Sequence, residues 1–134
     1  MSGPKTGQCM CGAVTFAVKD TPAKFNSCYC DMCRRWTGSR FLGVPLKQAD
    51  LSVADMSAVS TIQSSDWAER GFCNRCGTAL WYKALGTDRI NLSAGLFDDT
   101  DDLTLEREFF VDQKTCVHAF PETRIQLTRA ETIA

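Results

Sequence analysis

The sequence has a single histidine among 134 residues, and no apolar run approaches the length that crosses a lipid bilayer. Basic residues are not in excess, because 15 lysines and arginines stand against 16 acidic residues and leave a net charge of −1. A chain without a basic surplus is not expected to bind nucleic acid through bulk electrostatics. The first seven residues lack the apolar segment of a secretory signal, so we expect a cytoplasmic protein with no membrane attachment.

The composition is that of one globular domain, with 44% hydrophobic and 23% charged residues. Its length suits a single domain spanning residues 1–134 and is too short for two. Apolar and polar side chains alternate in residues 14–19, 59–63, 79–83 and 90–93, and residues 108–111 and 123–127 are also expected to be extended. Short helical turns are expected near residues 46–51 and 64–69. The pattern predicts a mostly β fold with many short strands around one core.

Cysteine is the residue in excess, since the chain has eight of them. Such a number indicates a disulfide framework, thiolate-bound metal or thiol redox chemistry. Because thiols stay reduced in the cytoplasm, metal binding is favoured over disulfides. Seven of the eight fall into three clusters, which are Cys9-x-Cys11, Cys28-x-Cys30-x-x-Cys33 and Cys73-x-x-Cys76.

The two outer clusters share a plan, in which a close cysteine pair is followed by glycine and then by a predicted strand. Gly12 and Gly77 can adopt a left-handed backbone, which allows a tight turn that points both thiolates of a pair at one ion. Two such pairs supply the four thiolates of a closed zinc site, and this site joins distant parts of the chain. We therefore predict a structural zinc whose four ligands are Cys9, Cys11, Cys73 and Cys76.

The middle cluster offers three cysteines, and three protein ligands plus water form the open arrangement of a catalytic zinc. A second Zn²⁺, making two per chain, is predicted to have three ligands, namely Cys28, Cys30 and Cys33. From spacing alone, Cys116 or His118 could be a distant fourth ligand, the clusters could pair differently, or iron–sulfur ligation could replace zinc. Thioredoxin-like use of the last cysteine pair is less favoured, because the surrounding βαβ pattern is missing.

Residues 9–14 (CMCGAV), 28–34 (CYCDMCR) and 70–80 (RGFCNRCGTAL) place these seven cysteines at a specific set of spacings. With these three motifs the chain resembles the glutathione-dependent formaldehyde-activating enzyme family, which also includes centromere protein V, over about residues 6–121. Two positions depart from the family pattern. Tyr29 stands where many members have histidine, and residues 114–118 replace a segment that often reads lysine, small residue, proline, tryptophan.

The resemblance implies a β-tent of short antiparallel sheets around two zinc ions, with the two outer clusters on the structural ion and the middle cluster at the glutathione site. It implies a zinc-dependent carbon–sulfur lyase that acts on a small thiol and an aldehyde. The founding activity of the family condenses formaldehyde with glutathione to S-hydroxymethylglutathione. The alternative function is a non-catalytic, zinc-stapled binding module. The sequence does not specify the aldehyde, the thiol or the oligomeric state.

Other residues near the clusters also allow specific expectations. Arg34 and Arg35 could hold the carboxylates of glutathione, although solvated surface charge is the better interpretation for at least one of them. Cys116 is expected to be a small buried apolar residue, and His118 to lie on the surface or to be hydrogen-bonded. Five aromatic residues are expected to pack in the core or against the cysteine turns: Trp36, Trp67, Phe72, Trp81 and Tyr82.

Overall fold

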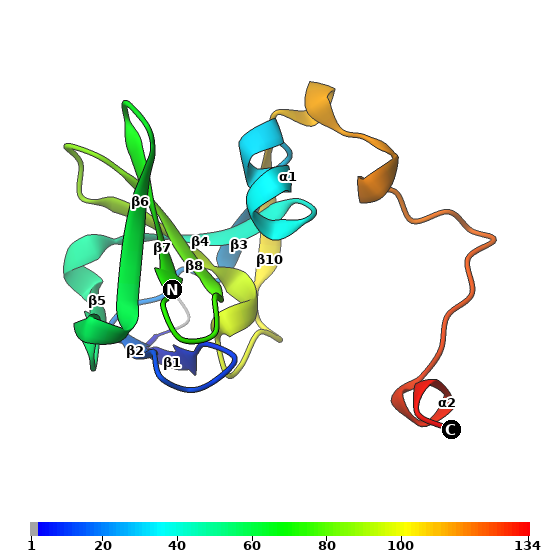
Figure 1. Cartoon of the computed structure of the whole chain (residues 1–134), viewed down its shortest axis with the longest axis horizontal. Helices are drawn as coiled ribbons and strands as arrows, with labels where there is room; N and C mark the ends of the chain where they lie inside the picture. The colour runs from blue at the N-terminus through cyan, green and yellow to red at the C-terminus, as the bar shows by residue number, and fades with distance from the viewer. Residues whose placement is uncertain (1–2) are drawn as a thin grey trace.

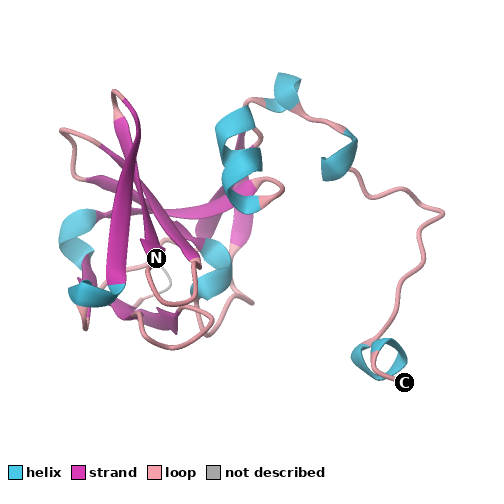
Figure 2. Cartoon of the chain, viewed as in Figure 1, coloured by secondary structure: helices cyan, strands magenta, loops and turns pink. Residues whose placement is uncertain are grey.

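The computed structural model describes residues 3–134, and its body consists mainly of β-strands with short helices at the periphery (Figures 1 and 2). A small sheet has the strand order β1 (Lys5–Gln8), β2 (Thr15–Val18), β5 (Leu51–Val53). A larger sheet has the order β10 (Thr104–Phe109), β3 (Lys24–Cys28), β4 (Phe41–Lys47), β9 (Arg89–Ser93), β8 (Ala79–Ala84), β7 (Ala68–Cys73), β6 (Val59–Ser65). The prediction of a mostly β fold is confirmed.

The alternating residues predicted from the sequence turn one face of the larger sheet into the core. Val44 and Leu46 of β4 pair with Leu92 and Ile90 of β9, and all four side chains are buried. Each such aliphatic side chain stabilises the fold by about 1.5–3 kcal/mol relative to an exposed position. The opposite face carries the polar row Arg70–Tyr82–Asn91 across β7, β8 and β9. Because side chains alternate along each strand, these three polar residues lie on the face of the sheet opposite the core.

Helix α1 (Asp31–Thr37) is not predicted by the sequence, because seven residues are too few to show a helical period. The Cys30 thiol caps the helix by accepting a hydrogen bond from the Cys33 N–H, and Gly38 ends it with a φ of 84°. The other helices are short: η1 (Gln48–Asp50), η2 (Met56–Ala58), η3 (Ala94–Leu96), η4 (Val111–Gln113), η5 (Cys116–His118) and α2 (Arg129–Thr132). Across residues 3–134, none is long and apolar enough to cross a membrane.

The structure differs from the sequence-based expectations at three places in the larger sheet. β10 runs parallel to β3, so the larger sheet is mixed and not antiparallel throughout. Residues 64–69, predicted as a helical turn, form the tip of the β6–β7 hairpin, since polar residues of this kind suit both structures. Residues 108–111 are only partly extended, because Phe110 has a left-handed φ of 58° and a helical turn begins at Val111.

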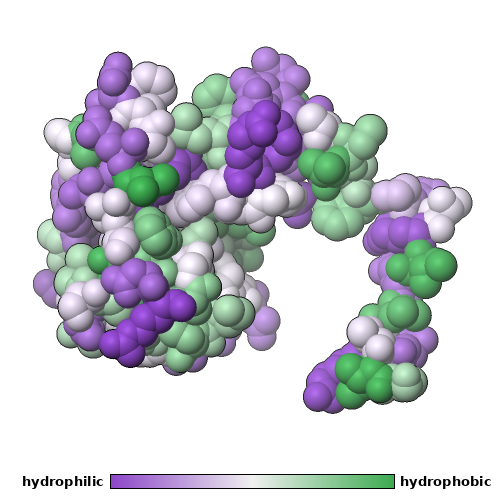
Figure 3. All heavy atoms as spheres, in the orientation of Figure 1, coloured by the Kyte–Doolittle hydropathy of each residue, from purple (hydrophilic) through white to green (hydrophobic). Residues whose placement is uncertain are grey.

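A C-terminal arm, residues 119–134, leaves the body after η5 and ends far from it (Figure 1). All of its residues are exposed, and hydrophobic groups are spaced along it (Figure 3). Arg40 of the body lies over the ring of Phe120, whereas the capping box of Thr128 and Glu131 in α2 is local to the arm. Residues 123–127, predicted to be extended, belong to no strand in the part of the chain described, because the arm has left the sheets.

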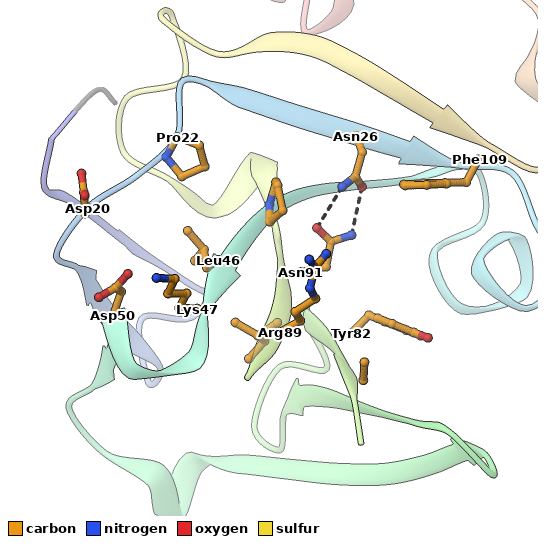
Figure 4. Close-up of a pocket in the computed structure, with 13 residues that line it drawn as sticks. Asp20, Pro22, Asn26, Leu46, Lys47, Asp50, Tyr82, Arg89, Asn91 and Phe109 are labelled. Atoms are coloured by element: carbon orange, nitrogen blue, oxygen red, sulfur yellow. Dashed lines mark hydrogen bonds between the residues drawn. The ribbon is translucent and has the colours of Figure 1, made fainter. Parts of the chain in front are cut away.

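Asn26 of β3 and Asn91 of β9 are joined by two amide hydrogen bonds of 3.2 Å and 2.9 Å that reach across β4 (Figure 4). The strand between them contributes Gly43, which pairs directly with Asn26. A Cβ at residue 43 would overlap the Asn91 side chain. The glycine is therefore required for the close approach of the two amides and not for a special φ.

Gly43→Ala is expected to destabilise the domain by about 1–3 kcal/mol, because the added methyl group displaces Asn91 from its partner. Thermal unfolding followed by circular dichroism should show a midpoint lowered by roughly 3–10 °C. Gly95→Ala is the matched control, since nothing lies within 4 Å of a Cβ there. Equal midpoints for the two variants would show that the amide pair tolerates the methyl group.

Candidate functional site

Four thiols from the two outer clusters converge at one point. The Sγ atoms of Cys9, Cys11, Cys73 and Cys76 all lie within 4.8 Å of one another. Cys11 Sγ is 3.7 Å from Cys9 Sγ and 3.8 Å from Cys73 Sγ. Sulfurs placed tetrahedrally around Zn²⁺ at about 2.3 Å are about 3.8 Å apart, whereas a disulfide holds them at about 2.05 Å. The group therefore fits a tetrahedral metal ion and not a pair of disulfides.

The two turns that carry these thiols share several backbone features. Gly12 and Gly77 have φ angles of 81° and 79°, as the sequence predicted. In each turn the N–H of the first cysteine donates a 3.0 Å hydrogen bond to the carbonyl five residues later. The sulfur of the first cysteine also accepts a backbone N–H, at 3.3 Å for Cys9 and 3.5 Å for Cys73. Both turns thus direct backbone donors at sulfur.

Thr78 links the two turns and acts on the thiol next to it. The Met10 N–H donates to Thr78 Oγ1 at 3.1 Å. The Thr78 hydroxyl lies 3.0 Å from Cys76 Sγ and lowers the pKa of Cys76 to about 5. At Cys9, burial acts to raise the pKa, but the Val14 N–H and neighbouring thiols bring the pKa below its ordinary value. Deprotonated thiols are what metal ligation requires.

The middle cluster brings its three thiols together at the end of β3. Cys28 is the last residue of that strand, and Cys30 and Cys33 belong to the first turn of α1. Their Sγ atoms lie within 4.8 Å of one another. A hydrogen bond from the Cys33 thiol holds the pKa of Cys28 below its ordinary value, and that same bond raises the pKa of Cys33. The cluster can therefore supply three donors to one metal ion.

Arg70 of β7 is the charged neighbour of this cluster, and sequence reasoning did not find its role. The side chain is 3% exposed, and its Nη1 lies 3.6 Å from Cys33 Sγ. The guanidinium carbon lies 4.8 Å from the Trp36 ring centroid and 5.2 Å from that of Tyr82. Among residues 3–134 no carboxylate forms an ion pair with Arg70. The sequence feature that could have indicated this role is the position of Arg70 on the strand that ends at Cys73. On this strand Arg70 pairs with Tyr82 of β8.

A cavity of about 480 Å³ lies over the three-thiol cluster. Its wall includes all three thiols, Arg70, Tyr82 and Asn91, and otherwise consists largely of apolar residues. Burial raises the pKa of Tyr82, so its hydroxyl stays neutral. Trp67 lines this cavity and is 67% exposed, so its expected place in the core is wrong. The thiols therefore face a space that can hold a small molecule.

A second cavity, of about 550 Å³, adjoins the first and shares Tyr82, Asn91 and Phe109 with it (Figure 4). The Asn26–Asn91 pair lies along its wall. This wall also carries two residues of each charge: Asp20, Asp50, Lys47 and Arg89. The second cavity is therefore more highly charged than the one over the thiols.

Tyr29, which stands between two thiols of the middle cluster, contacts residues of β10 and of the segment that follows it. Its hydroxyl donates a 2.6 Å hydrogen bond to Glu108 and holds the pKa of that carboxyl below its ordinary value. Lys114 lies 4.6 Å over the Tyr29 ring and 3.5 Å from the Glu108 carboxylate. The His118 ring packs edge-on against Tyr29 at 5.1 Å. Tyr29 thus connects the site to the segment that departs from the family pattern.

The remaining sequence-predicted residues lie outside both thiol groups. Cys116 is exposed, so the expectation of a buried residue is wrong, and it does not join either group. His118 is buried, accepts a hydrogen bond from the Thr115 N–H and joins neither group. Arg34 lies 3.7 Å from Asp31, and neither Arg34 nor Arg35 lines the cavity over the thiols.

Fold and site together define a mostly β protein with two cysteine groups that can hold metal ions, one of them at a cavity. Residues 4–113 match the family model of the glutathione-dependent formaldehyde-activating enzymes, and the chain belongs to this family.

Relatives of known name agree with this membership. An uncharacterised lyase of Schizosaccharomyces pombe is 29% identical over 128 residues, covering 95% of this chain and 93% of that protein. A Halomonas elongata protein, named provisionally as a glutathione-dependent formaldehyde-activating enzyme, is 37% identical over 83 residues, which cover 56% of this chain and 53% of that protein. The crystal structure of a Rhodobacter sphaeroides protein shares the fold, with a TM-score of 0.60 and 22% identity over 69% of this chain and 87% of that one.

Proposed function

We propose that this protein is a zinc-dependent carbon–sulfur lyase that joins and separates a small thiol, such as glutathione, and an aldehyde. The observation that carries the proposal is the three-thiol cluster, which faces a cavity with three donors for a tetrahedral ion. Membership of the family and the lyase name of one relative support the reaction class. Eight free cysteines suit the reducing cytoplasm, where we propose that the protein acts.

The two thiol groups have different roles in this proposal. Cys9, Cys11, Cys73 and Cys76 would saturate one zinc ion and hold the fold together. Cys28, Cys30 and Cys33 would hold a second zinc ion with one position free. Zinc bound by these three cysteines would supply a coordination position for a thiol and would lower the pKa of that thiol. The chain's residues then have to position the aldehyde carbon, exclude water and balance the charge of the thiolates.

Arg70 is the residue that balances this charge. Three thiolates around one Zn²⁺ would carry +2 − 3 = −1, and the guanidinium beside Cys33 would offset this charge. The guanidinium carbon lies 4.8 Å from the Trp36 ring centroid and 5.2 Å from that of Tyr82, and cation–π contacts of this kind help to hold the group beside the thiols. A buried cation without a carboxylate partner is costly, which explains why its counter-charge must come from the thiolates.

The overall reaction needs no redox partner. The thiol adds across the carbonyl group, so a carbon–sulfur bond forms, the carbonyl π-bond breaks, and the thiol proton ends on oxygen. In the reverse direction the same bonds are restored. Because this addition is rapid without an enzyme, close approach and an ionised thiol account for the catalysis that the site must provide.

Cobalt substitution tests the open position directly. Glutathione added to the cobalt-loaded protein is expected to shift the sulfur-to-cobalt charge-transfer absorption and to saturate at one equivalent per chain. S-methylglutathione is the matched control, because its sulfur carries no ionisable proton, and it should leave these bands unchanged. A spectrum that glutathione does not alter would mean that the second metal is coordinatively closed, and the lyase proposal would fail.

A further inference from the structure

The cavity over the three-thiol cluster has a rim of large apolar side chains. Four of them are substantially exposed: Met32 (43%), Trp67 (67%), Phe109 (40%) and Phe110 (52%). Phe41, which is 2% exposed, lies deeper in the same wall. Exposed apolar residues scattered singly are ordinary, but a group of them around one concave site marks a binding surface. The rim therefore needs an apolar occupant.

These residues come from three separate parts of the chain. Met32 belongs to α1, Trp67 lies between β6 and β7, and Phe109 and Phe110 lie at the end of β10. Phe110 is held in the left-handed region with a φ of 58°, which is uncommon for a residue with a bulky side chain. The backbone is thus constrained at a residue that lines the cavity. The convergence of distant segments and the constrained backbone at Phe110 both indicate that the fold forms this surface specifically.

The charged groups in the wall of this cavity do not favour a highly charged ligand group next to the three thiols. Arg70 is the one cation among the described residues that line this cavity, and it is 3% exposed and in contact with Ser64 and Cys33. Asp31 adds a negative charge to the same wall. Lys47 and Arg89 lie in the adjoining cavity instead. The space next to the thiols therefore favours an uncharged carbon skeleton.

The cavity is also large for the smallest aldehyde. At about 480 Å³ it is in the range of sites that enclose drug-sized ligands. Formaldehyde contributes a single carbon to a thiol adduct. This one carbon is too small to occupy the space between the four exposed aromatic and thioether side chains of the rim.

We propose that this apolar cavity binds the alkyl chain or aromatic ring of an aldehyde larger than formaldehyde, so that the site prefers thiol adducts with a bulky apolar group on sulfur. This inference rests on the proposed function, because it specifies the carbonyl partner of that reaction. The thiol adds across the aldehyde carbonyl, its proton passes to oxygen, and the new carbon–sulfur bond places the apolar group against Trp67 and Phe110.

A series of S-alkylglutathiones, which are stable thioether analogues of such adducts, tests this in the full-length, zinc-loaded protein. Isothermal titration calorimetry with S-methyl-, S-butyl- and S-hexylglutathione is expected to show binding that tightens about fourfold for each methylene group. S-hexylglutathione, which has five more methylene groups, should therefore bind about a thousandfold more tightly than S-methylglutathione. Affinities equal within threefold across the series would overturn the proposal.

Substitutions at the rim test which side chains contact the alkyl group. Trp67→Ala and Phe110→Ala are expected to reduce the preference for the hexyl group at least about tenfold and to leave the metal content unchanged, since both side chains are exposed and neither is a thiol. Ile62→Ala is the matched control, because Ile62 is 50% exposed on β6 and does not line the cavity. A chain-length effect that persists in the Trp67 and Phe110 variants would place the apolar subsite elsewhere and overturn the assignment.

The rim could alternatively be covered by a second copy of the chain, and sedimentation distinguishes this. Trp67→Ala and Phe110→Ala are expected to leave the sedimentation coefficient unchanged. A shift towards a smaller species would show that the rim is an interface, and the substrate assignment would fall. If affinity does not depend on alkyl length but glutathione still shifts the cobalt absorption, only the apolar subsite is wrong. If glutathione does not shift the cobalt absorption, the proposed function itself is wrong.

Discussion

Cys73→Ser is expected to abolish the folded domain at 37 °C and to leave protein that retains little zinc. Cys73 is fully buried, and its sulfur lies 3.8 Å from that of Cys11, 62 residues earlier. Apparent binding free energies of structural zinc reach about 10–16 kcal/mol, which equals or exceeds the total stability of about 5–15 kcal/mol of an ordinary domain. Loss of one ligand therefore removes a large part of what holds the small sheet to the larger one.

Far-UV circular dichroism, the yield of soluble protein and metal analysis measure this effect. Cys116→Ser is the matched control, because Cys116 is exposed and lies outside both thiol groups. This control should keep the zinc content, spectrum and unfolding midpoint of the parent. If Cys73→Ser keeps a native spectrum and full zinc content, the four-thiol group is not a structural metal site.

Cys30→Ser is expected to have a large effect of a different kind, with one of two zinc ions lost, thiol–aldehyde activity abolished and the fold retained. The three thiols of the middle cluster lie within six consecutive residues, so their metal ion closes no long loop. Serine also preserves the helix cap, because its oxygen can accept the hydrogen bond that the Cys30 sulfur accepts from the Cys33 N–H.

Metal analysis, the circular dichroism spectrum and turnover of S-hydroxymethylglutathione check the three parts of this expectation. Cys30→Ala provides a comparison, because it removes both the metal ligand and the cap and should cost about 1 kcal/mol more stability than serine. If Cys30→Ser unfolds as Cys73→Ser is expected to do, the middle cluster is structural and the open-site mechanism is wrong.

The structure brings the cysteines of each predicted thiol group together, although spacing alone had left the pairing of the clusters open. A close cysteine pair followed by glycine fixes a local turn, and the structure has that turn at Gly12 and Gly77 with matching φ angles. Alternating side chains likewise predicted β2, β6, β8 and β9, because the face that each residue takes in a strand is a local property.

Features that depend on distant partners could not be predicted in this way. Whether β10 lies parallel or antiparallel to β3 is decided by the path of the chain between them, which leaves no local pattern. Arg70 and Trp67 lie three residues apart in one hairpin, yet the arginine is buried and the tryptophan is exposed. Ordinary expectations for the two residue types are reversed here because the cavity with its thiols, and not the core, sets their environment.

The placement of Arg70 also affects how a ligand first meets the site. Glutathione carries a net negative charge at neutral pH, and an uncompensated anionic centre at the base of an apolar cavity would repel it more strongly than one in water. A guanidinium fixed beside Cys33 would offset the negative charge of three thiolates around a bound Zn²⁺, so this repulsion would be weaker. Arg70 is therefore expected to affect the rate of encounter as well as the stability of the bound thiolate, although it is almost wholly buried in the cavity wall.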